Sequence, residues 1–328
     1  MTGRYERYDA LDGLRVLAMA GILVMHVLAN LDYENELAGF YRYIVYFGDF
    51  TALFMIVSAF SVSCGYYHRI KNGNFDEIQG FYKKRYSKLF PFFCFLTAVD
   101  VLLELNVHSI YEGIANISFV FGLIPHEGIT VIGVGWTLGV IFVFYLLYPF
   151  FVFCMSNTKR FMLLSIGALF YAFVCNEYFG LGKVDFLYCA LYFVTGCGLY
   201  LYRDKVKNVN RIFSFVIMLV SGFVFFAFKQ HHALFKYAFL TFLMVYAIVV
   251  SGKKTILANK FLHQLNNYSF EIYLCHMVAF RCVEKTNLTR LFDSALLSYT
   301  VTCILVFAIS FVIAYAFKFV ESKLKEKR

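Results

Sequence analysis

The sequence predicts an all-α integral membrane protein, a bundle of about ten transmembrane helices with both termini in the cytoplasm. Three observations support this fold class. Hydrophobic residues make up 61% of the 328 residues and charged residues only 16%, whereas about 25% is typical of soluble domains. Apolar stretches long enough to cross a bilayer core recur along the whole chain. Lysine and arginine residues alternate between the two sides that this arrangement defines.

The predicted spans follow one another with short polar connections. A further stretch, 110–124, is shorter and contains Glu112, Asn116 and Ser118. We expect it to be interfacial or re-entrant, with an eleventh span as the alternative. The ten spans are predicted at 11–31, 40–67, 89–105, 131–155, 161–180, 185–202, 212–229, 234–251, 267–284 and 295–318.

The positive charges set the orientation. With the N-terminus inside, 22 of the 30 Lys and Arg residues lie in cytoplasmic segments and 7 in outer ones, while Arg15 lies within the first span. This bias agrees with the positive-inside rule, and an eleventh full span would reverse every later loop. Because all loops are short, we expect one transmembrane domain over 1–328 and no extramembrane domain.

The net charge of +9 does not indicate nucleic-acid binding, because the charges lie in the gaps between apolar runs. The 9 Cys residues form no C-x-x-C pair and lie within or beside apolar runs. We therefore interpret them as small buried hydrophobic residues rather than metal ligands, and we expect no metal site.

The first span carries the strongest functional signal. Positions eleven apart on a helix differ by about 20° and lie roughly 16 Å apart along its axis, so Arg15 and His26 share one face. Ionisable side chains inside a membrane are costly and usually functional. The alternatives are that Arg15 snorkels to the interface and that His26 is a hydrogen-bonded packing residue. Asp12 lies about 60° from Arg15, where it can pair with Arg15 or favour the helix N-terminus.

Three further elements contain candidate residues. Arg85 and Lys88 lie one turn apart where the third span leaves the cytoplasm, and they suit phosphate groups, although the positive-inside rule also explains basic residues there. Trp136, the single tryptophan, is either a site residue or an anchor in the aromatic belt. His276 is a second histidine within a span, and its alternative is again a structural role.

Together these elements resemble the integral-membrane acyltransferase family three, the O-acyltransferases of cell-surface polysaccharides. Its glutamate after the tryptophan is replaced by Ile141, and the extracellular esterase-like domain of some members is missing. The elements that carry the resemblance are LDGLR (11–15) with the apolar run to His26, LFMIVSAF (53–60) with Ser58, KRYSKLFP (84–91), Trp136 to Tyr145, Tyr268 to His276, and the tail FVESKLKEK.

The resemblance implies a cytoplasmic acyl-CoA donor, most often acetyl-CoA, and a glycan or lipid-linked sugar acceptor. His26 would act as general base on the acceptor hydroxyl, with Asp12 as the second catalytic residue. Residues expected to bind the substrates are Arg15, Arg85, Lys88, Trp136, His276 and Ser58.

The resemblance also implies a bacterial inner membrane protein in contact with membrane lipid, with no permanently bound cofactor. The main alternative is a transporter or flippase for a lipid-linked sugar. A glycan polymerase and a non-catalytic scaffold are weaker alternatives, because the chain lacks a long outer loop and because a scaffold leaves the intramembrane Arg15 and His26 unexplained.

Overall fold

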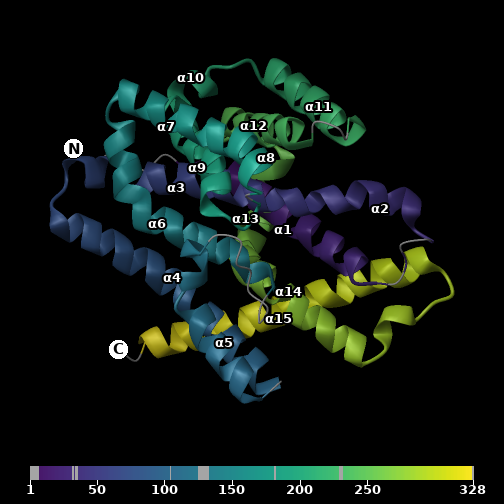
Figure 1. Ribbon diagram of the computed structural model, residues 1–328. Coiled ribbons are helices and arrows are strands. Elements are labelled where there is room, and N and C mark those ends of the chain that lie inside the picture. Colours follow the sequence, from purple (N-terminus) through teal and green to yellow (C-terminus); the bar gives the residue numbers. More distant parts are fainter. Residues whose placement is uncertain are drawn as a thin grey trace. The chain divides into compact units, whose positions relative to one another are not determined.

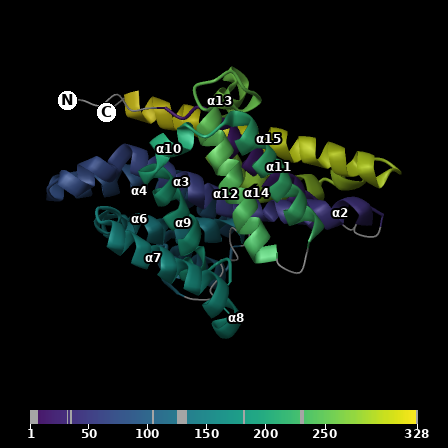
Figure 2. The same cartoon turned by 90° about the horizontal axis from the view of Figure 1, so that it is seen from above.

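The computed structural model describes residues 7–31, 33, 36–103, 105–124, 133–180, 182–228 and 232–326. Every regular element of these residues is helical (Figures 1 and 2), as the fold class predicts. The helices form two compact units, each discontinuous in sequence: unit 1 comprises Met1–Leu11 and Ala52–Ala258, and unit 2 comprises Asp12–Thr51 and Asn259–Arg328. The chain passes from one unit to the other inside the helices α1 and α3.

Unit 2 contains most of α1 (Ala10–Ala29) and the C-terminal helices. Its other elements are α2 (Ala38–Ile44), η1 (Val45–Asp49), α13 (Lys260–Asn266), α14 (Ser269–Lys285), η6 (Leu288–Arg290) and α15 (Ala295–Glu326).

Unit 1 contains the long α3 (Phe50–Asn72) and α4 (Phe75–Leu103) and the central part of the chain. Its other elements are α5 (Val107–Ile117), η2 (Val120–Leu123), η3 (Gly133–Gly135), α6 (Trp136–Met155), α7 (Thr158–Phe170), the π-helical turn η4 (Tyr171–Cys175), α8 (Asn176–Phe179), α9 (Phe186–Leu201), α10 (Arg203–Lys207), α11 (Arg211–Ala227), α12 (His232–Val250) and η5 (Ile256–Ala258).

All ten predicted spans coincide largely with helix. Residues 104, 131, 132 and 229, at the edges of three of them, lie outside the described residues. Five helical stretches in the described part of the chain are long and apolar enough to cross a membrane: Ala10–Ala29, Ala38–Asn72, Gly133–Met155, Ala233–Val250 and Ala295–Glu326. Two shorter apolar helices, Phe186–Leu201 and Arg211–Ala227, match the sixth and seventh predicted spans. The chain is therefore a multi-pass helical membrane protein, and the count of ten stays a prediction.

The segment 110–124 contains most of the short helix α5 and the single turn η2. The 11 residues of α5 rise about 16 Å, roughly half of a bilayer core. The helix ends at Ile117, Phe119 adopts the left-handed conformation with a φ of 58°, and η2 follows. This geometry favours the interfacial or re-entrant interpretation over an eleventh span.

Asparagine side chains cap the N-termini of several helices at the short polar connections. Asn157 accepts hydrogen bonds from the backbone N–H groups of residues 159 and 160 at the start of α7, and Asn210 caps α11 in the same way. Asn259 accepts from the N–H of Leu262 at the start of α13. These caps satisfy N–H groups that a helix end leaves without partners.

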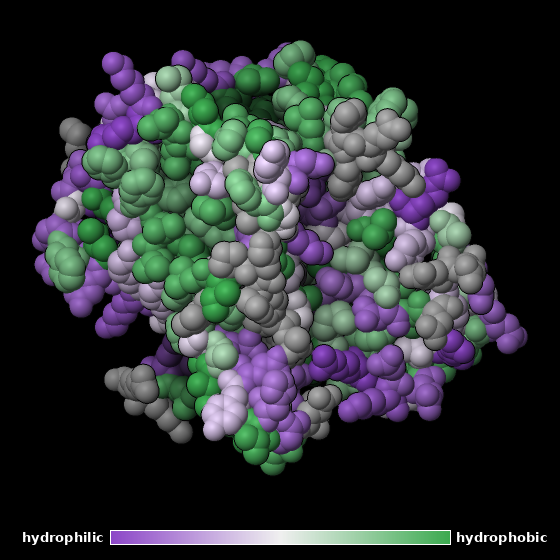
Figure 3. All heavy atoms as spheres, viewed as in Figure 1, coloured by the Kyte–Doolittle hydropathy of each residue, from purple (hydrophilic) through white to green (hydrophobic). Residues whose placement is uncertain are grey.

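Aromatic stacking and close backbone contact hold unit 1 together. The rings of Phe144 on α6 and Phe193 on α9 stack with centroids 4.2 Å apart. A Cβ at Gly196 of α9 would lie 2.3 Å from the backbone oxygen of Ile56 on α3, so only glycine permits this helix approach. On the outside of the unit, large apolar side chains of α6 and α7 are exposed, and Figure 3 shows broad hydrophobic areas with hydrophilic residues toward the rim.

Candidate functional site

The two intramembrane histidines predicted from the sequence lie together in unit 2. His26 occupies the last turn of α1, and His276 lies in the middle of α14. Their ring centroids are 5.3 Å apart, and the rings are inclined by 44°. His276 is buried, with 1% of its surface exposed, whereas His26 is half-buried. The pair combines an accessible imidazole with an enclosed one.

The hydrogen bond of His276 determines its tautomer. Its Nδ1 lies 2.6 Å from the backbone oxygen of Tyr273, and because a carbonyl oxygen only accepts, Nδ1 must carry the proton. In the neutral ring Nε2 then carries a lone pair. This atom is buried and has no hydrogen-bond partner among the described residues. Buried polar atoms are rarely left without a partner. Nε2 is therefore suited to accept a hydrogen bond from a donor group of a substrate or from an N–H of His26.

A second cluster forms around Asp12 at the other end of α1. Oδ1 of Asp12 accepts hydrogen bonds from Nδ2 of Asn266 at 2.8 Å and from the guanidinium of Arg15 at 3.2 Å. Oδ2 lies 2.8 Å from Nδ1 of His263. Asp12 is buried, so this carboxylate connects α13 to α1 and orients Arg15. Of the two roles considered for Asp12, the pairing with Arg15 is present, and Asp12 also lies in the first turn of α1.

The histidine pair and the Asp12 cluster are separate. Asp12 precedes His26 by fourteen residues on the same helix, which corresponds to about 21 Å along its axis. Arg15 lies about 16 Å from His26 by the same rise. Asp12 therefore belongs to the arginine end of this face and does not contact His26. The ring of His263 on α13 also reaches the Asp12 carboxylate, although this side chain is 44% exposed.

An ion pair joins the beginning of α14 to α15. Glu271, which is 7% exposed, lies with Oε1 3.3 Å from Nζ of Lys318. Lys318 also donates to the backbone oxygen of Asn267, next to the helix start. These contacts set the position of α14, and hence of His276 five residues beyond Glu271. This pair was not predicted from the sequence; the signal that could have indicated it is Glu271, an acidic residue within the apolar run 267–284.

Arg85 is held between tyrosine rings in unit 1. Its guanidinium carbon lies 4.8 Å from the centre of the Tyr66 ring and 5.6 Å from that of Tyr145. Its Nε is buried without a hydrogen-bond partner among the described residues. Such stacking fixes a guanidinium while leaving its N–H groups available for a phosphate. Tyr66 and Tyr145 were not singled out from the sequence, because their role depends on the packing of α3 and α6 against α4.

The remaining predicted site residues of unit 1 lie on three helices. Lys88 is exposed, one turn beyond Arg85 on α4, and Ser58 is half-buried in the middle of α3. Trp136 is the half-buried first residue of α6. Ile141, where the resembling family has a glutamate, is buried and supplies no carboxylate.

Among the described residues, no group of three or more His, Cys, Asp or Glu side chains could hold a metal ion.

The chain matches the model of one protein family, described as an acyltransferase domain, over residues 8–315. No curated protein and no solved structure matches it. The match spans nearly the whole chain and includes both units, the histidine pair, the Asp12 cluster and Arg85.

Proposed function

We propose that this chain, which belongs to the acyltransferase family whose model matches it, is a membrane O-acyltransferase that moves an acetyl group from acetyl-CoA to a hydroxyl of a cell-surface or lipid-linked glycan. The observation that carries the proposal is the pair of His26 and His276 within a membrane-spanning unit. An imidazole changes protonation near neutral pH and is the side chain most often used for general acid–base catalysis.

The proposed reaction is a direct transfer. His26 removes the proton from the acceptor hydroxyl while the oxygen of that hydroxyl forms a bond to the thioester carbonyl carbon. The tetrahedral intermediate collapses by breaking the bond from carbon to sulfur, and the protonated His26 returns the proton to the departing CoA thiolate. The products are the O-acetylated glycan and free CoA, and His26 ends in its starting state. No covalent enzyme intermediate and no permanent cofactor is needed.

His276 is proposed to orient this reaction. Its Nδ1–H donates to the Tyr273 carbonyl. The lone pair on Nε2 can therefore accept a hydrogen bond either from an N–H of His26 or from the acceptor hydroxyl. Accepting from His26 would fix the tautomer and direction of the base, as carboxylates do for catalytic histidines elsewhere. The buried, unpartnered state of Nε2 supports this role.

Basic residues are proposed to hold the phosphates of the donor. Arg15, whose direction is set by Asp12, and Arg85 and Lys88 on α4 are the candidates, all predicted on the cytoplasmic side by the charge pattern. Asp12 thus acts as a positioning residue, a revision of its assignment as catalytic. Ser58 and Trp136 are retained as substrate-binding candidates. The proposed location is the bacterial inner membrane.

The test is His26→Ala in a bacterial strain whose own gene has been removed, with O-acetyl groups on the surface glycan measured by mass spectrometry. Loss of general-base catalysis is expected to lower transfer about 10²- to 10⁴-fold. His108→Ala, at an exposed histidine of α5, is the control and should retain full acetylation. Full acetylation by His26→Ala at normal protein level would refute the catalytic role. Purified wild-type protein should also bind acetyl-CoA, whereas a flippase for lipid-linked sugars, which no observation favours, should not.

A further inference from the structure

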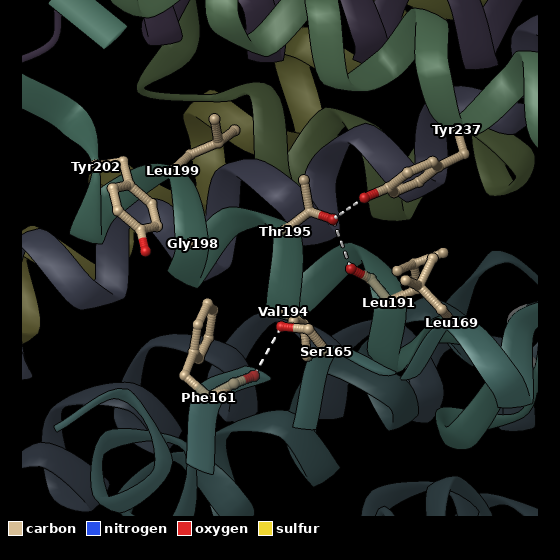
Figure 4. Close-up of a pocket in the computed structure, with 10 residues that line it drawn as sticks. All are labelled: Phe161, Ser165, Leu169, Leu191, Val194, Thr195, Gly198, Leu199, Tyr202 and Tyr237. Atoms are coloured by element: carbon tan, nitrogen blue, oxygen red, sulfur yellow. Dashed lines mark hydrogen bonds between the residues drawn. The ribbon is translucent and has the colours of Figure 1, made fainter. Parts of the chain in front are cut away.

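Two regions of unit 1 differ in how their polar groups are satisfied. In the open groove between α7, α9 and α12, which Figure 4 shows, the hydroxyls of Thr195 and Tyr237 lie 2.9 Å apart, and Thr195 also donates to the backbone oxygen of Leu191. On α4, by contrast, the buried Nε of Arg85 and the buried hydroxyl of Tyr86 have no hydrogen-bond partner among the described residues. Because buried polar atoms usually have partners, the region around Arg85 is the better suited to a polar ligand.

One aromatic ring lies between α4 and α6 close to Arg85. Phe119 follows the end of α5 and is completely buried. Its ring centroid lies 5.0 Å from that of Phe90 and 5.0 Å from that of Phe93, both on α4. It lies 5.2 Å from the ring centroid of Phe142 on α6, with which it stacks at 12°. The ring of Phe119 is therefore a wedge that sets the spacing of these two helices.

The wedge lies within about one and a half helical turns of Arg85 and its aromatic contacts. Phe90 follows Arg85 by five residues on α4, about 7.5 Å along the axis. Phe142 precedes Tyr145, whose ring contacts the Arg85 guanidinium, by three residues on α6, about 4.5 Å. Tyr86, next to Arg85, also packs against Phe142 with 5.2 Å between the ring centroids. A change in the spacing of α4 and α6 at the wedge would therefore shift Arg85 relative to Tyr145.

Helix α4 depends on side-chain packing at this level. Pro91 lies inside the helix, and because proline has no N–H it removes one backbone hydrogen bond there. Helices commonly kink at such positions. Phe119 packs against Phe90 and Phe93, one on either side of Pro91, so its ring supports α4 where the backbone ladder is interrupted.

The chain holds Phe119 in a costly backbone conformation. Its φ is 58°, in the left-handed region that bulky residues rarely adopt. The other non-glycine residue with a positive φ among the described residues is Asn287, a residue type that tolerates this region. Glycine would fit position 119 without strain but would supply no ring. Strain of this kind persists only where the surroundings impose it, and here the ring contacts on α4 and α6 do so.

The segment that follows the wedge is fixed against α6. A Cβ at Gly122 of η2 would lie 2.4 Å from the backbone oxygen of Gly139, so the two backbones are in direct contact there. Because this contact holds η2 on α6, the ring of Phe119 stays against Phe142.

We propose that Phe119 is a positioning residue for the donor site: its ring sets the spacing of α4 and α6 and thereby holds Arg85 where the guanidinium meets a phosphate of acetyl-CoA. The inference rests on the proposed function, in which Arg85 binds the donor. It gives the segment 110–124 a role, since this segment follows a connection that the charge pattern predicts outside and ends against the site of the cytoplasmic donor.

The experiment measures acetyl-CoA affinity by calorimetry and thermal unfolding of the purified full-length protein in detergent. Phe119→Ala removes the wedge and should weaken acetyl-CoA binding about three- to tenfold, up to the effect of one charge-assisted contact. In the Arg85→Ala background it should cause little further loss, because residues that act through one contact are not additive. The matched control is Phe225→Ala, at a buried ring of α11 that stacks on Phe239 of α12. It should lower the unfolding temperature and leave the affinity unchanged.

Glycine at the same position separates support of the donor site from stability. Phe119→Gly also lacks the ring but relieves the positive φ, so it should unfold at a higher temperature than Phe119→Ala and bind acetyl-CoA no better. Phe119→Leu keeps most of the apolar volume, provides a third folded variant and should have intermediate affinity.

Three results would overturn the inference alone: wild-type affinity in Phe119→Ala, an undiminished effect of Phe119→Ala in the Arg85→Ala background, or an affinity that simply follows the unfolding temperature across the variants. Absence of acetyl-CoA binding by the wild-type protein would overturn the proposed function and the inference together.

Discussion

Replacement of His276 by phenylalanine separates the chemical role of this residue from its packing role. His276→Phe keeps a planar ring of similar size in the enclosed position on α14. It removes the Nδ1–H that bonds to the Tyr273 oxygen at 2.6 Å, and it removes the buried Nε2 that has no partner among the described residues. The two losses act on stability with opposite signs.

The magnitudes nearly cancel. The lost hydrogen bond contributes about 0.5–1.5 kcal/mol, while a buried polar atom without a partner costs about 1–3 kcal/mol. The phenyl ring is also better suited to burial than an imidazole. We therefore expect the free energy of unfolding of His276→Phe to lie within about 1 kcal/mol of the wild-type value or slightly above it.

Activity should respond differently. If Nε2 of His276 orients the base or the acceptor, its loss should lower the turnover of acetyl transfer about 10- to 100-fold, part of the effect of general-base catalysis as a whole. Binding of acetyl-CoA should not change. His276→Gln, whose amide oxygen can still accept a hydrogen bond, should recover part of the turnover.

The assay combines three measurements on each variant: thermal unfolding in detergent, acetyl-CoA binding by calorimetry, and O-acetyl content of the surface glycan in complemented cells. A stable His276→Phe protein with wild-type turnover would refute the positioning role and leave His276 as a packing residue. A parallel fall of stability and activity would refute the cancellation argued above.

Two further predictions concern Asp12 and Arg85. Asp12→Asn keeps an oxygen for Asn266 but loses the charge opposite Arg15 and His263. Because these partners are partly exposed, we expect the free energy of unfolding to fall by about 1–3 kcal/mol, which thermal unfolding measures. We also expect weaker acetyl-CoA binding, which calorimetry measures. Unchanged stability would show that this carboxylate does not hold α13 to α1. Arg85→Ala should weaken acetyl-CoA binding about tenfold, the effect of one charge-assisted contact. The control Lys83→Ala, at an exposed position of α4, should leave this binding unchanged. Equal effects of the two substitutions would argue against a specific contact between Arg85 and a phosphate.

Periodicity and spacing were sufficient for the contacts within one helix. Asp12 and Arg15 are three residues apart, and helical geometry alone predicts their pairing. Apolar length predicted where helices lie, since helix is the form in which a single membrane segment satisfies its own backbone. Apolar length did not settle the placement of the segment 110–124, because its composition is compatible with more than one placement. The break in the helix before Phe119 corresponds to no clear pattern in the sequence.

Contacts between distant segments required the folded chain. The sequence identified His26 and His276 as unusual separately, but their approach to 5.3 Å depends on how α14 packs, which the Glu271–Lys318 ion pair helps to set. The contact of His263 on α13 with Asp12, 251 residues earlier in the chain, also could not be predicted from either local sequence. The tyrosines around Arg85 were likewise hidden among the 25 of the sequence.

The sequence by itself determined that this is a helical membrane protein of the acyltransferase family, because membrane insertion depends on local apolarity and charge, and because the family elements are linear. Only the tertiary structure decided that two histidines form a pair, in which the buried Nε2 of His276 has no hydrogen-bond partner among the described residues, and that His263 and Asn266 contact the Asp12 carboxylate. These features arise from packing between helices, which no local pattern encodes.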